Sequence, residues 1–101
     1  MTTRSVAELI EAYRLSPTPT VYDVFAEAYS NLQGAYSEAG ESASSPAESD
    51  LWLDRARALH RFRDRVAPDD RRAAIEAIVL MGREREQVLA HIDAQAASPA
   101  A

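Results

Sequence analysis

The sequence of 101 residues contains no cysteine, no lysine and only three glycines. Without cysteine the chain cannot form disulfides, thiol nucleophiles or cysteine-ligated zinc and iron–sulfur centres. Glycine is too scarce for β-hairpins, and strict alternation of apolar and polar residues is never sustained. No stretch approaches the roughly 18 apolar residues of a membrane span, and the N-terminus has no apolar run of signal-peptide length. We therefore expect an all-α, cytoplasmic protein that does not enter a membrane.

The charge balance is mildly acidic. Eleven arginines supply all the basic side chains against sixteen acidic ones, which gives a formal net charge of −5 at pH 7. Such a charge does not draw a protein to nucleic acid by bulk electrostatics. The length fits one domain, and 47% apolar residues suffice for one core.

Capping signals divide the chain into helices. Ser5 and Glu8 form a capping box that predicts a short helix ending near Leu15. The prolines between Ser16 and Thr20 interrupt it, since each lacks an amide donor. A second helix is expected over 21–39, capped by Thr20 and followed by a polar loop over 40–45 with Gly40 at the helix C-cap.

Two further helices complete the expected fold. Ser45-Pro46-Ala47-Glu48 is a strong start signal, and it predicts a third helix running to about Val66. The fourth is expected over 71–92, and it is apolar on more than one face, so other helices or a second copy must cover it. We predict a small bundle of one short and three long helices, up-down antiparallel, forming a single domain over 1–96 with a disordered tail over 97–101.

Aromatic residues recur at helical spacing in the second helix. Tyr22, Phe25, Tyr29, Leu32 and Tyr36 share one edge, and the tyrosines suggest either a core stripe or a stacking surface. We favour the core, with each hydroxyl at its rim.

Two arginines fall within apolar stripes of the third and fourth helices. Arg55 and Arg85 would point towards a core, where an unpaired charge is costly. Either they stack on Tyr29, Tyr36 or Trp52, or they line a groove that receives an acidic side chain or anion from a partner. We favour stacking on the aromatic rings, but the groove is the most specific hypothesis for a binding site in this sequence.

Leu53 and Leu80 lie off the main stripes and indicate apolar surface left over after folding. That surface would serve a homodimer or dock another protein. The leading hypothesis is therefore a non-enzymatic interaction module, such as a small regulator, inhibitor or adaptor. Its predicted partner-binding residues are Arg55, Arg85, Tyr29, Tyr36, Leu53 and Leu80.

The alternative hypothesis is a dimeric DNA-binding regulator. Arg57, Arg61 and Arg65 share the outer face of the third helix and could contact phosphates, although aspartates accompany them and the net charge is acidic. The isolated histidines His60 and His91 predict no metal site. With no phosphate-binding loop and no nucleophile motif, we expect no cofactor and no catalysis.

Overall fold

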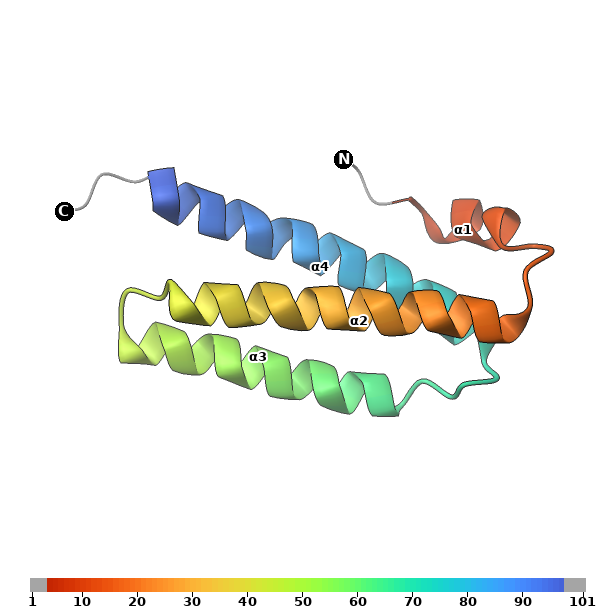
Figure 1. The fold of residues 1–101 in the computed structure, drawn as a ribbon, viewed down its shortest axis with the longest axis horizontal. Coiled ribbons are helices and arrows are strands. Elements are labelled where there is room, and N and C mark those ends of the chain that lie inside the picture. Colours follow the sequence, from red (N-terminus) through yellow and green to blue (C-terminus); the bar gives the residue numbers. More distant parts are fainter. Residues whose placement is uncertain (1–3, 98–101) are drawn as a thin grey trace.

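The computed structural model describes residues 4–97, and Figure 1 shows their arrangement. This range forms four α-helices and no strand, so the predicted all-α class of one short and three long helices is confirmed. The helices are α1 (Val6–Ala12), α2 (Thr18–Glu41), α3 (Pro46–Asp64) and α4 (Arg71–Ala97).

Two of the three predicted helix N-caps are present, at Ser5 and Ser45, whereas Thr20, predicted to cap the second helix, lies inside α2. Ser5 Oγ accepts a hydrogen bond from the Glu8 amide at 3.2 Å, and Glu8 Oε1 accepts one from the Ser5 amide at 3.4 Å. Ser45 Oγ accepts from the Glu48 amide at 3.1 Å at the start of α3. The Asp70 carboxylate accepts from the Ala73 amide at 3.0 Å and caps α4. Each bond satisfies an amide that the first helical turn leaves free.

Several predicted helix ends were wrong. α1 ends at Ala12 rather than near Leu15. Beyond this end the guanidinium of Arg71 binds two backbone carbonyls: its Nη2 donates to Tyr13 and its Nη1 to Ser16 at 2.7 Å. α2 begins at Thr18, with Pro17 as its N-cap and a second proline in its first turn, where an amide donor is not needed.

At their C-terminal ends, α2 and α4 extend further than predicted, whereas α3 ends at Asp64, before the predicted end near Val66. Gly40 lies inside α2, and Ser42 is the C-cap. α4 continues past Ile92 to Ala97, and Gln95 in this extension donates to Glu48 Oε1 at 2.8 Å. Ala97, assigned to a disordered tail, is therefore the last residue of α4; the rest of that predicted tail, 98–101, lies outside the described residues.

The long helices alternate in direction along the chain, and α2 lies at the centre (Figure 1). α3 packs antiparallel on one side of α2, while α4 crosses the other side in a roughly parallel direction, and α1 packs on α4. α3 and α4 approach one another only through long side chains. The molecule is accordingly elongated and thin, with Cα extents of 52 × 27 × 15 Å.

The core follows α2. Val21 and Phe25 are fully buried and Leu32 nearly so, and they meet Ile75 and Val79 of α4. Burying one such side chain contributes roughly 1.5–3 kcal/mol. Ala77 of α4 is buried as well, since α1 and α2 both pack on α4. Between residues 4 and 97, no helix is both long and apolar enough to cross a lipid bilayer.

Candidate partner-binding groove between α3 and α4

Because α3 and α4 both pack on α2 but not on each other's backbone, a groove remains between them. It consists of two adjoining depressions of about 200 and 220 Å³ that meet at Glu84. We call it the α3/α4 groove. Its apolar depression is lined by Leu32, Tyr36, Leu59, Phe62, Leu80, Met81 and Glu84. Its mixed depression is lined by Leu51, Trp52, Arg55, Glu84, Gln87, Val88 and His91.

The apolar depression has a buried floor and an exposed rim. Leu32 on the floor is 2% exposed, whereas Leu80 on the rim is 56% exposed. Leu80 stays uncovered because α4 carries apolar residues around more of its circumference than α1 and α2 occupy. Each depression by itself is smaller than the roughly 300–1,000 Å³ of small-molecule sites, a size that suits a single protruding side chain of a partner.

A hydrogen bond joins α2 to α4 where the two depressions meet. The hydroxyl of Tyr36 donates to Glu84 Oε2 at 2.6 Å. Burial of Tyr36 raises the pKa of its phenol above the usual value, and the hydrogen bond to the Glu84 carboxylate and the charge of that carboxylate raise it further. The phenol is therefore held neutral, and the centre of the groove carries a single carboxylate.

Arg55 of α3 lines the mixed depression, as Glu84 does. Its guanidinium carbon is 4.8 Å from the centroid of the Trp52 ring, a cation–π contact. Trp52 itself is buried and packs against α2, where a Cβ atom added at Gly40 would make an ordinary van der Waals contact of 3.8 Å with its Cβ. The structural alternative predicted for Arg55, stacking on Trp52, is thus present.

The far end of the groove is closed by a polar contact between the start of α3 and the end of α4. His91 Nε2 lies 3.3 Å from Glu48 Oε1, and its ring centroid lies 5.3 Å from that of Trp52. Hydrogen bonds from the Ser44 hydroxyl, the Ser44 amide and Gln95 lower the pKa of Glu48 to about 2. No sequence pattern predicted this contact, since its partners are far apart in the chain and Gln95 lies beyond the predicted end of the fourth helix at Ile92.

Two buried polar atoms near this contact have no protein partner within the described part of the chain. They are Nε1 of Trp52 and Oε1 of Gln95. Buried polar atoms of this kind usually bind ordered water.

The structure brings together three of the predicted partner-binding residues: Tyr36, Arg55 and Leu80 line the α3/α4 groove. Leu53 instead lines a depression between α2 and α3, where it is 48% exposed. Arg85 lines another groove, formed by α1, α2 and α4.

Tyr29 lies apart from the α3/α4 groove, at the packing of α2 on α3. Its hydroxyl is 3.2 Å from His60 Nδ1 and accepts from Gln33 at 2.9 Å. The guanidinium of Arg63 lies 4.6 Å from the ring centroid. The tyrosine is therefore half-buried with its hydroxyl at the rim.

The expectation that Arg55 and Arg85 point towards the core is wrong. Both are exposed. The prediction used the helical period of each helix in isolation. In the structure, the side of α3 that carries Arg55 faces the open α3/α4 groove. Arg85 lies at the outer edge of the contact between α4 and α2.

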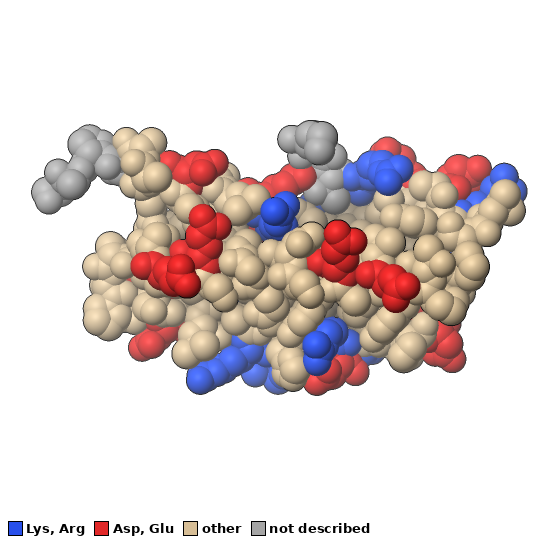
Figure 2. Space-filling view, in the orientation of Figure 1, with Lys and Arg blue, Asp and Glu red and all other residues tan. Residues whose placement is uncertain are grey.

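Arg57, Arg61 and Arg65 are all exposed on α3. Figure 2 shows arginines along the lower edge of the molecule, over α3, with acidic residues beside them. Arg57 lies 3.8 Å from Asp54, and Asp64 lies near both His60 and Arg63. Exposed pairs of this kind contribute about 0–1 kcal/mol each, so this row is a solvated, mixed-charge face.

Within residues 4–97, no three histidine or acidic side chains come together in a way that could hold a metal ion. Comparison with family models, with curated proteins and with solved structures finds no match to this chain.

Proposed function

We propose that this protein is a non-enzymatic interaction module that binds an amphipathic helix of another protein in the α3/α4 groove. The observation that carries the proposal is Leu80, a large apolar side chain that is more than half exposed beside an apolar floor. Isolated exposed leucines are common on protein surfaces. This one adjoins a depression that other apolar residues line, which is the arrangement that helix-binding grooves use.

The geometry indicates what such a helix carries. An apolar side chain of the partner fills the depression between Phe62 and Leu80 and displaces water from both. About one or two turns along the helix, an acidic side chain faces Arg55, whose guanidinium is stacked on Trp52 but has no ion-pair partner within residues 4–97. Preorganised by this stacking, Arg55 loses little conformational freedom when it pairs.

The test compares two leucine-to-glutamate variants. Leu80→Glu places a charge on the groove, whereas Leu15→Glu makes the same change at a site that is 85% exposed in the link between α1 and α2. Light scattering gives the mass of each purified protein, and photo-crosslinking from position 87, which also lines the groove, detects a bound partner in cell extract. Circular dichroism confirms that both variants stay helical.

We expect association to be lost in Leu80→Glu and kept in Leu15→Glu. A mass of twice 11.1 kDa for the wild type would identify a second copy as the source of the docked helix. A monomer whose crosslinks do not depend on Leu80 would refute the proposal. Binding of duplex DNA that requires Arg57, Arg61 and Arg65 would replace it with DNA recognition.

A further inference from the structure

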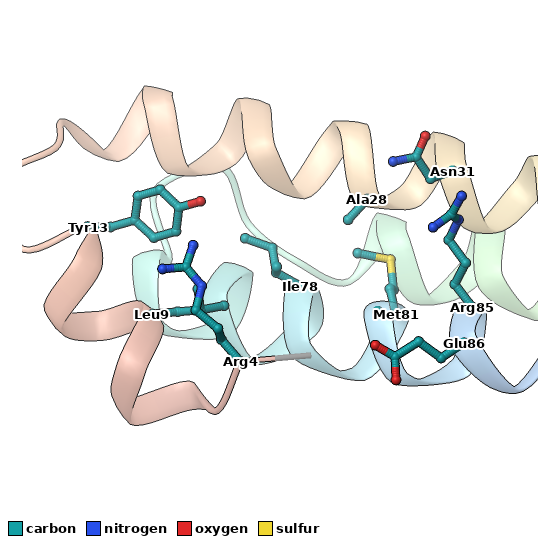
Figure 3. Close-up of a pocket in the computed structure, with 10 residues that line it drawn as sticks. Arg4, Leu9, Tyr13, Ala28, Asn31, Ile78, Met81, Arg85 and Glu86 are labelled. Atoms are coloured by element: carbon teal, nitrogen blue, oxygen red, sulfur yellow. The ribbon is translucent and has the colours of Figure 1, made fainter. Parts of the chain in front are cut away.

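A second groove lies where α1, α2 and α4 meet, and Figure 3 shows it in close-up. Its volume is about 300 Å³, at the lower end of the range for small-molecule sites. Its floor is apolar and comes from all three helices: Leu9, Ala28, Ile78 and Met81. This groove has room for a small organic molecule with an apolar body.

Each end of this second groove carries an arginine and another polar side chain. In Figure 3 the guanidinium of Arg4 lies near the Tyr13 ring at one end, and that of Arg85 lies near the Asn31 amide at the other. The apolar floor separates the two ends. The cationic groups are therefore spread along the groove rather than gathered at one point.

The polar side chains at both ends are free to bind a ligand. Within the described range 4–97, those of Arg4, Tyr13, Asn31 and Arg85 make no hydrogen bond or ion pair with one another or with the rest of the chain. Elsewhere on α4, Arg72 pairs with an acid one turn away, Glu76, at 2.9 Å.

Arg85 has no such neighbour on its own helix. The positions three and four residues away from it, which share its face, are Met81, Gly82, Val88 and Leu89. Glu86 also lines the groove, but it is engaged in an interaction of its own and pairs with neither arginine. Two arginines against one glutamate leave the lining with a positive balance.

We infer that this second groove binds a small dicarboxylate whose two carboxylates are separated by an apolar spacer. One carboxylate pairs with Arg4 and accepts from the Tyr13 hydroxyl, and the other pairs with Arg85 and accepts from the Asn31 amide. Guanidinium groups only donate, so each end of the ligand must accept, and a carboxylate matches the guanidinium fork. The apolar floor favours a hydrocarbon spacer over a hydroxylated one.

The length of the spacer follows from α4. Ile78 lies towards the Arg4 end, and it is separated from Arg85 by a rise of about 10 Å along the helix. We therefore expect a longer diacid such as suberate to pair with both arginines, and a short one such as succinate to pair with only one.

The experiment titrates the isotopically labelled full-length protein with suberate, succinate and octanoate, followed by NMR. Octanoate matches the length of suberate but has one carboxylate. We expect saturable shifts at the Asn31 side-chain amide and the Gly82 backbone amide, and binding of suberate roughly fivefold to tenfold tighter than that of octanoate, as one added charge-assisted hydrogen bond provides at an exposed site. Succinate should bind no better than octanoate.

Single substitutions distinguish binding in this second groove from non-specific attraction of anions to the protein. Arg4→Ala and Arg85→Ala should each reduce suberate affinity to that of octanoate, while Glu86→Gln should increase it. Arg83→Ala is the matched control, because Arg83 is exposed on the same helix and does not line the groove. Equal binding of suberate and octanoate to the wild type, absence of saturable shifts, or an equal loss in Arg83→Ala would each overturn the inference.

Discussion

Replacing Tyr36 with phenylalanine tests the hydrogen bond that joins α2 to α4 at the centre of the α3/α4 groove. The substitution removes one hydroxyl and keeps the ring, which is 5% exposed and packs 6.0 Å from the Trp52 ring between centroids. The lost contact is the 2.6 Å hydrogen bond to the Glu84 carboxylate. We expect the variant to keep the fold and to unfold at a lower urea concentration.

The size of the loss follows from the charge on the acceptor. A hydrogen bond to a charged group contributes a net ~1.5–3 kcal/mol, and the lower end applies here because Glu84 is only half-buried and regains water when the hydroxyl is removed. We therefore expect a loss of about 1.5 kcal/mol in the free energy of unfolding at pH 7. In a double-mutant cycle with Glu84→Ala, the two losses should not add, since both variants remove the same contact.

The pH dependence has a defined sign. The folded-state pKa of Tyr36 is raised above the usual value of about 10, so folding favours the neutral phenol. The resulting stabilisation is fully present below pH about 10 and is lost as the pH rises above it. The phenylalanine variant lacks this titration, so the stability difference between the two proteins should shrink in alkaline solution.

Urea unfolding followed by circular dichroism, at pH 7 and above pH about 10, measures these quantities. Equal stability of wild type and variant at pH 7, or additive losses in the cycle, would show that the hydroxyl and the carboxylate do not interact as described.

Three further predictions concern stability. Gly34→Ala should raise the free energy of unfolding by about 0.5–1 kcal/mol, because the position is exposed inside α2 and an added Cβ meets no atom within 4 Å; thermal unfolding would detect it, and a lower midpoint would contradict it. Leu32→Ala should cost about 2–5 kcal/mol and Leu80→Ala less than about 1 kcal/mol, since one is buried and the other is 56% exposed; equal losses in urea unfolding would argue against the open groove. Glu48→Gln should reduce stability at neutral pH, and its difference from the wild type should disappear as the pH falls from about 4.3 towards 2, because the folded-state pKa is lowered to about 2; an acid titration followed by circular dichroism that shows a constant difference would exclude this contribution.

The sequence by itself determined the helical class and the starts of α1 and α3. Ser5 and Ser45 accept hydrogen bonds from amides three residues ahead, so neighbours in the chain are enough to specify these starts. The period of apolar residues likewise identified most of the buried stripe of α2, and it marked Leu80 as surplus apolar surface.

Other features depended on contacts between distant residues. Arg71 binds the backbone carbonyls that follow α1, although it lies more than fifty residues further along the chain, and Gln95 in the last turns of α4 binds Glu48. Periodicity contains no information about such partners, because it describes each helix in isolation.

The arrangement of the helices decided the rest. Helical period shows which residues share a face but not which helix covers that face, so it could not reveal that α4 packs on α2 and leaves α3 apart. That choice opens the α3/α4 groove, exposes Arg55 and separates it from Arg85, and brings Arg85 into a groove with Arg4. Side chains from separate helices converge only when the core is packed, and both proposed sites therefore arise from tertiary structure.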